Sequence, residues 1–239
     1  MTPIILTGDS HLAAIKRGAD LLEDPRVRSR FVFWPIGSAA VARAAFHDRD
    51  QRNGSVTVVP SRSSPLVFSQ ASMVAVGPDA SLVISLPLHS VRFLRFYSWE
   101  THVPWRHARE EVALSDRMVE EMIDEDCLHA VAFVRDVAQV LPRVHVLEAP
   151  RLFGNSNVLK ERRPEVLLDL QEAYRERVRT KLAKLGVPVI DQPSETITED
   201  GMTDLAYDNE NPGDQYHANG AYGKLALEAV LRNVDAGSA

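Results

Sequence analysis

The sequence predicts an α/β protein built on a mostly parallel sheet. Short apolar runs alternate along the chain with longer stretches of helical periodicity, which is the pattern of repeated strand–helix–strand units. The chain has 239 residues, a length that suits one large α/β domain better than two small ones. We therefore expect a single domain over residues 1–239.

Five strands follow from the short apolar runs. The first run, Pro3-Ile4-Ile5-Leu6-Thr7, is directly followed by Gly8. The strands are expected at residues 4–6, 30–34, 82–86, 143–147 and 187–190.

Four helices connect or follow these strands. The helix over about 164–185 has apolar side chains near a spacing of 3.6 residues, and Gly186 ends it as C-terminal glycines do. The helices are expected at about residues 11–22, 115–141, 164–185 and 219–232.

An insertion separates the second and third strands. Residues 55–60 and 72–77 read as short β segments bounded by Gly and Pro. They predict an accessory β insertion at about 54–77.

Two motifs near the ends of the chain carry the chemistry. Gly8-Asp9-Ser10-His11 follows the first strand, and Asp214-Gln215-Tyr216-His217 comes shortly before the last helix. A serine hydroxyl needs an adjacent base to become a nucleophile at neutral pH, and histidine is suited to that task. A carboxylate on the second ring nitrogen fixes the tautomer and stabilises the imidazolium. The candidate catalytic residues are thus Ser10, His217 and Asp214.

Each motif alone also has an ordinary structural explanation. Gly-Asp-Ser is a common turn tripeptide, and an Asp before a helix is often a cap. The pair is more specific than either part, because one motif ends the first strand and the other opens the last helix. The free N–H groups of a helix start at Ser10 would face a developing oxyanion.

These motifs and the order of strands resemble the SGNH hydrolase superfamily, also called the GDSL esterase/lipase family. The resemblance implies a three-layer, flavodoxin-like sandwich, with Ser10 as nucleophile, His217 as base and Asp214 as its partner. The family's second block places a glycine after the second strand, and Gly37 is the match here. The backbone N–H groups of Ser10 and Gly37 would form the oxyanion hole.

The third block of the family departs from its usual pattern. The family has Gly-x-Asn-Asp after a strand, whereas Pro87-Leu88-His89-Ser90 stands here, with His89 in the place of the Asn. An imidazole can donate a hydrogen bond, so His89 is a candidate third oxyanion donor. The alternative is a structural histidine at a strand end.

The segment after the third strand, residues 91–107, is dense in aromatic side chains and is expected to line the substrate pocket. The alternative is that these aromatics pack onto the core or form a subunit contact. Residues 150–157 are a second candidate wall, and His102 and His107 rank below His217 as base. The candidate substrate-binding residues are Phe93, Phe96, Tyr97, Trp99 and Trp105.

Composition excludes several classes of protein. The net charge of −6 leaves no basic footprint for nucleic acid, and the single cysteine, Cys127, excludes an internal disulfide and is expected to be a packing residue. No segment reads as a signal peptide or as a membrane span, which predicts a cytoplasmic protein. No metal or other cofactor is expected, and the oligomeric state stays open.

The sequence thus predicts a hydrolase that cleaves an acyl ester through an acyl-enzyme. The partner would be a small-molecule ester: an acetylated carbohydrate, a short lipid ester or a thioester. Two alternatives remain, namely an acyltransferase with the same triad and a non-catalytic binding protein of this fold.

Overall fold

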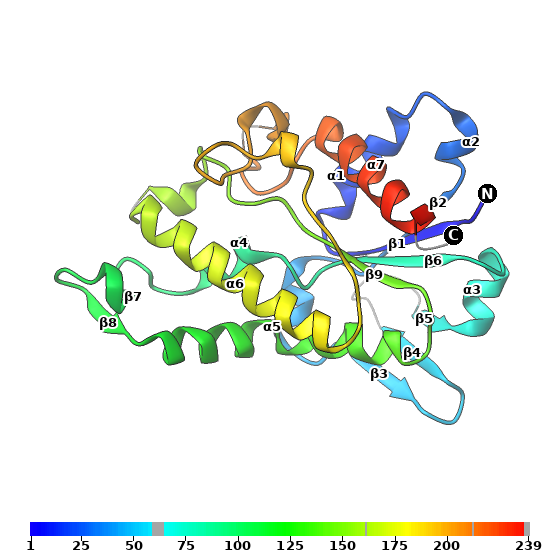
Figure 1. The fold of residues 1–239 in the computed structure, drawn as a ribbon, viewed down its shortest axis with the longest axis horizontal. Helices are drawn as coiled ribbons and strands as arrows, with labels where there is room; N and C mark the ends of the chain where they lie inside the picture. Colours follow the sequence, from blue (N-terminus) through cyan, green and yellow to red (C-terminus); the bar gives the residue numbers. More distant parts are fainter. Residues whose placement is uncertain (59–64, 161, 212, 237–239) are drawn as a thin grey trace.

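A parallel five-stranded sheet forms the centre of the molecule (Figure 1). The computed structural model describes residues 1–58, 65–160, 162–211 and 213–236. The strand order is β10-β9-β6-β1-β2, with β1 paired to both β2 and β6. The strands are β1 (Ile4–Gly8), β2 (Phe31–Pro35), β6 (Ser81–Ser85), β9 (Val144–Leu147) and β10 (Val189–Ile190). The α/β fold class with a five-stranded parallel sheet is confirmed, and all five strands overlap their predicted ranges.

Helices cover both faces of the sheet and complete the three layers of a flavodoxin-like sandwich. Ile4 and Leu6 pack toward α1 and α7, whereas Ile5 packs toward α5 and α6, as the two-residue period of a strand requires. The four predicted long helices are present as α1 (Leu12–Asp20), α5 (Asp116–Ala138), α6 (Pro164–Lys184) and α7 (Gly220–Ala236). A short helix, α2 (Pro25–Arg28), precedes β2.

Helices α1 and α7 lie in unusually close contact. A Cβ added at Gly18 would lie 2.1 Å from the carbonyl carbon of Gly223, and one added at Gly223 would lie 2.1 Å from the carbonyl oxygen of Ala14. Arg17 also donates a hydrogen bond to the Ala218 carbonyl, 2.8 Å away, just before α7 begins. The first and last helices of the chain are therefore held side by side, backbone against backbone.

The insertion is a small antiparallel sheet followed by a helix. Strand β4 (Ser55–Val58) pairs with β3 (His47–Asp50) and β5 (Leu66–Ser69). The β segment predicted at 55–60 is present as far as residue 58, and residues 59 and 60 lie outside the described residues. The β segment predicted at 72–77 is wrong, because residues 70–76 form α3 (Gln70–Val76). Reciprocal hydrogen bonds between Ser69 and Ser72 cap its start, and this local capping overrides the β-branched composition.

The segment after β6 is helical rather than a loop. Helix α4 (Ser90–Phe96) begins directly after His89. It leads to the short parallel pair β7 (His102–Pro104) and β8 (Val112–Leu114), which Figure 1 places at the tip of the molecule, far from α1. The remaining single turns are η1 (Ala39–Arg43), η2 (Trp105–His107), η3 (Asn157–Leu159), η4 (Ser194–Thr196) and η5 (Leu205–Tyr207). Among the described residues, no helix has both the length and the apolar composition needed to cross a bilayer.

Candidate active site

Ser10 lies just past the carboxyl end of β1, which pairs with β2 and β6, in the turn that leads into α1. The turn is tight, because Ala13 N–H donates to the Ser10 carbonyl at 3.1 Å. Gly8, two residues earlier, has φ +158° and passes so close to β6 that an added Cβ would lie 2.2 Å from the Ser85 carbonyl oxygen. Only glycine allows the strand to turn there against its neighbour, so this residue sets the position of Ser10.

Ser10, His217 and Asp214 form a continuous chain of short contacts. Ser10 Oγ lies 2.7 Å from His217 Nε2, and His217 Nδ1 lies 2.8 Å from both carboxylate oxygens of Asp214. The side chains of His217 and Asp214 are 27% and 29% exposed, so water can reach these two members of the contact chain. With the Nδ1 proton directed at Asp214, His217 Nε2 presents a lone pair to the serine hydroxyl.

Local hydrogen bonds hold the Asp214 carboxylate in place. Its Oδ1 accepts the backbone N–H groups of Tyr216 and His217, at 3.3 and 3.2 Å, in an Asx-type turn. Its Oδ2 accepts from Asn209 Nδ2 at 3.3 Å. The Asp-x-x-His spacing thus lets one carboxylate order both the turn and the imidazole.

The predicted oxyanion donors are two backbone N–H groups, that of Ser10 after β1 and that of Gly37 after β2. Within the described part of the chain, neither the Ser10 N–H nor the Gly37 N–H donates to a protein acceptor. Gly37 follows β2, the strand that neighbours β1 in register from Ile4 to Gly8. The two groups therefore belong to the carboxyl ends of adjacent strands, where the sequence predicted them.

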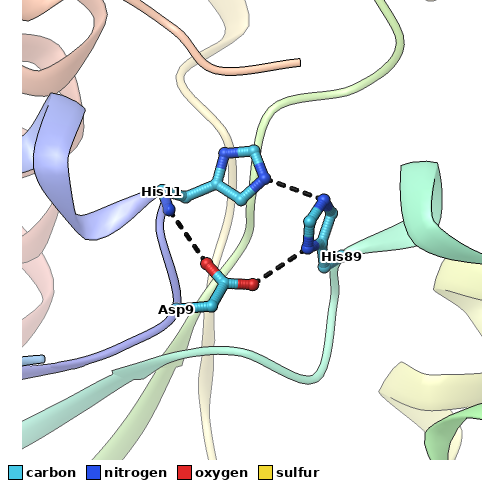
Figure 2. Close-up of side chains that lie close together, drawn as sticks. All are labelled: Asp9, His11 and His89. Carbon is cyan, nitrogen blue, oxygen red and sulfur yellow. Dashed lines mark hydrogen bonds and ion pairs between the residues drawn. The ribbon is translucent and has the colours of Figure 1, made fainter. Parts of the chain in front are cut away.

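His89 lies beside this site, in a buried network with Asp9 and His11 (Figure 2). His89 Nδ1 is 2.9 Å from Asp9 Oδ2, and His89 Nε2 is 2.8 Å from His11 Nε2. Asp9 Oδ1 accepts the backbone N–H of His11 at 3.0 Å. Both ring nitrogens of His89 are thus engaged by the turn that carries Ser10, and its Nε2 would reach an oxyanion only by leaving His11.

The protonation of this network follows from its charges. Burial raises the pKa of Asp9, but attraction to His89 and His11 and their hydrogen bonds outweigh it and lower the pKa from 3.8 to about 2. Burial and the neighbouring His89 lower the pKa of His11 well below 6.5, so His11 is neutral at pH 7. When both rings are neutral, His89 Nδ1–H donates to Asp9 and His11 Nε2–H donates to His89.

Asp9, His11 and His89 are also the one group of potential metal ligands found within the described residues. One ligand atom from each lies within 4.8 Å of the others. However, both Asp9 oxygens and the facing nitrogens of the two rings already hydrogen-bond to one another. The facing atoms of the cluster therefore satisfy one another as a hydrogen-bonded chain, whereas the buried His11 Nδ1 has no partner among the described residues.

The predicted substrate-binding aromatics divide into two sets. Phe93 and Trp99 are 0% and 2% exposed and stack on each other with ring centres 5.1 Å apart; Tyr97 packs against both. These three belong to the core, which is the alternative that the sequence left open. Phe96 is 49% exposed beside the site, whereas Trp105, 59% exposed, lies in η2 between β7 and β8. Trp105 donates a hydrogen bond to Asp116 at 3.0 Å.

The other residues that the sequence analysis named differ in where they lie relative to Ser10. His102 hydrogen-bonds Thr101, and His107 pairs with Asp169 at 3.0 Å on the β7–β8 segment. Cys127 is fully buried, and burial raises its pKa to about 11, as expected for a packing residue. In the segment 150–157, Asn157 N–H donates to Gln215 Oε1 at 2.9 Å, so this segment borders the Asp214–His217 turn.

Sequence reasoning did not identify His11 as part of the site. Its ring lies 4.9 Å from that of His217 and 4.1 Å from that of His89, measured between ring centres. The sequence did contain an indication of this role, because Asp9, Ser10 and His11 follow one another directly after a buried strand. Three successive polar side chains cannot all cap the helix that begins there.

Comparison with known proteins gives structural likenesses alone. No family model matches the chain, and no curated protein does. An acetyl xylan esterase has 11% identity and a TM-score of 0.48, with 97% of this chain and 99% of that chain covered. A carbohydrate acetylesterase from Sinorhizobium meliloti has 12% identity and a TM-score of 0.46, with 99% of each chain covered. A GDSL-like lipase from Bacteroides thetaiotaomicron has 8% identity and a TM-score of 0.46, with 99% and 89% covered. At such identities and TM-scores, the activity of this chain has to be inferred from its own residues.

Proposed function

We propose that this protein is a serine esterase of the SGNH type that hydrolyses an acyl ester. The observation that carries the proposal is the contact chain from Ser10 Oγ to His217 Nε2 at 2.7 Å and from His217 Nδ1 to Asp214 at 2.8 Å. A hydroxyl aligned with a neutral imidazole whose other nitrogen faces a carboxylate is the arrangement that acyl transfer requires.

The reaction would proceed in two halves. Ser10 Oγ attacks the ester carbonyl while His217 Nε2 takes its proton, and the tetrahedral intermediate expels the alcohol, which leaves with that proton. Water then enters, loses a proton to His217 and attacks the acyl-enzyme. Collapse of the second intermediate releases the acid and returns the proton to Ser10.

The developing oxyanion would be held by the backbone N–H groups of Ser10 and Gly37, which have no acceptor among the described residues. His89 remains a proposed third donor only in the form that carries a proton on Nε2. In the hydrogen-bonded chain of Asp9, His89 and His11, its more direct role is to position the turn that carries Ser10.

The exposure of the triad favours hydrolysis over the two alternatives from the sequence. His217 and Asp214 are about one quarter exposed, so water reaches the base directly, whereas an acyltransferase has to keep water from its acyl-enzyme. A binding protein has no need for the three aligned contacts. The substrate candidates remain an acetylated carbohydrate, a short lipid ester and a thioester. The cytoplasmic location also stays a prediction, which cell fractionation tests.

Active-site labelling tests the nucleophile without knowledge of the substrate. We expect a fluorophosphonate probe to modify Ser10 and no other serine, as read by mass spectrometry of peptides. Ser10→Ala should abolish labelling, and Ser194→Ala, an exposed serine in η4, should label like the wild type. Labelling of a different serine, or none in a protein folded by circular dichroism, would refute the esterase proposal.

A further inference from the structure

Two arginines beside the active site have aromatic rather than acidic partners. The guanidinium of Arg43, at the end of η1, lies 4.4 Å from the ring centre of Phe96. The guanidinium of Arg95, in α4, lies 3.9 Å from the ring centre of Tyr216 and 5.9 Å from that of Phe96. We call Arg43, Arg95, Phe96 and Tyr216 the arginine rim.

The rim adjoins the catalytic residues through three separate elements. Tyr216 directly precedes His217, α4 directly follows His89, and η1 follows Gly37. The elements η1 and α4 come after β2 and β6, which flank β1 in the sheet. A group bound on the rim would therefore lie close to an ester carbonyl at Ser10.

The rim carries positive charge that no carboxylate of the described residues compensates, in an acidic protein. Across the described ranges, neither Arg43 nor Arg95 has a carboxylate oxygen within 4.0 Å. Most of the other described arginines pair with acids, as Arg92 does with Asp126 at 2.6 Å. The nearest acid in sequence to Tyr216 is Asp214, whose carboxylate is directed at His217. With a net charge of −6, the chain has ample acids, yet none of those described pairs with this edge of the site.

Stacking leaves the binding capacity of the guanidinium groups free. A guanidinium over an aromatic face is attracted by the ring, while its N–H donors remain in its own plane and fit a carboxylate or phosphate. Both arginines are exposed, so a ligand can reach them. The rings also restrict the two side chains before a ligand arrives.

We propose that the arginine rim binds an anionic group of the substrate, so that the substrate class is acyl esters bearing a carboxylate or phosphate near the scissile bond. This inference rests on the proposed esterase function. Arg43 and Arg95 determine specificity through the anion, while bond cleavage stays with Ser10 and His217.

Matched substrates test the rim. Hydrolysis of 3-acetoxybenzoate and 3-acetoxyphenyl phosphate would be compared with that of the neutral 3-acetoxybenzamide. The wild type should prefer the anions in kcat/KM, mainly through KM, and added salt should reduce the preference. Arg43→Gln/Arg95→Gln should lower the anion-to-neutral ratio about tenfold or more, and the double Lys variant should restore part of it. Arg52→Gln, an exposed arginine in the β3–β4 turn, should keep the wild-type ratio.

The outcomes separate this inference from the esterase proposal. If the wild type and the double Gln variant hydrolyse the benzamide and have the same anion-to-neutral ratio of kcat/KM, the rim proposal is wrong and the esterase proposal stands. If none of the esters is hydrolysed, binding still tests the rim: the Ser10→Ala protein would be titrated with 3-hydroxybenzoate and with 3-hydroxybenzamide. Tighter binding of 3-hydroxybenzoate than of 3-hydroxybenzamide, with the difference lost when both arginines are also changed to Gln, would support anion binding at the rim. Equal binding of the two ligands would contradict it. The two anionic substrates distinguish a carboxylate from a phosphate ligand.

Discussion

The Asp9 carboxylate ties together two segments that border the active site. One of its oxygens accepts the His11 N–H inside the Ser10 turn, and the other accepts from His89 after β6. Asp9 and both imidazoles are buried, so their hydrogen bonds are shielded from competing water. The position of the turn that carries Ser10 therefore depends on an ionised carboxylate that takes no proton in the proposed reaction.

The pKa of Asp9 makes this dependence a function of pH. Its folded pKa is about 2 and its ordinary value is 3.8, so the ionised carboxylate stabilises the fold fully above about pH 4. That contribution should be lost as the pH falls from about 4 to about 2. We expect the stability gap between wild type and Asp9→Asn, measured by urea unfolding, to narrow across this window. A gap that stays constant from pH 7 to pH 2.5 would contradict the low pKa.

His89 can be tested by separating stability from turnover. Because both of its ring nitrogens are engaged, His89→Ala leaves Asp9 and His11 buried without this partner, at a cost of about 1–3 kcal/mol. We expect a fall in Tm of several degrees and a loss in kcat of less than about tenfold in the folded fraction. A loss on the order of 10²–10³ in kcat with Tm unchanged, partly restored in His89→Asn, would instead assign an oxyanion donor.

At the scale of elements, the contact between α1 and α7 places the two halves of the proposed triad together. Ser10 comes two residues before α1, and His217 comes three residues before α7. The glycines at the crossing let the two backbones approach more closely than any side chain would permit. The distance from Ser10 to His217 is thus set by the packing of two helices.

Enlarging this crossing should loosen the whole site. In Gly223→Ala, the new methyl would lie 2.1 Å from the Ala14 carbonyl oxygen, a backbone atom that cannot move alone. We expect a loss of about 1–3 kcal/mol in unfolding free energy and a lower kcat, because the helices have to separate. Gly154→Ala, whose Cβ would lie 3.7 Å from the Met202 sulfur, is the control and should change little. Equal melting curves for the two variants would contradict the tight crossing.

For the whole molecule, the sequence was sufficient to predict the sheet and the contact chain. The strands are short, continuous runs of buried residues, and Ser10 and His217 lie within three residues of a strand or helix end, where position follows from topology. The strand predicted at residues 72–77 was wrong because the β-branched Val74 and Val76 favour a strand, whereas the Ser69–Ser72 capping box starts a helix.

Tertiary contacts explain what the sequence did not predict. Whether Phe93 and Trp99 face substrate or core depends on how α4 packs on α6, which no local pattern encodes. The arginine rim likewise joins η1, α4 and the Asp214–His217 turn, which are remote in sequence. Such clusters become visible only when the loops at the sheet edge are placed in space.

The close crossing of α1 and α7 also has a consequence for the order in which the protein forms. Ser10 and His217 are 207 positions apart, so their pairing closes one of the longest loops in the chain. During refolding, reactivity of Ser10 toward a fluorophosphonate should rise with the slowest phase, after most helical circular dichroism has returned. If reactivity instead rises together with the helical signal, the two ends meet early. On the first outcome, the nucleophile stays inert in every partly folded form of the chain, and esterase activity marks completion of the fold.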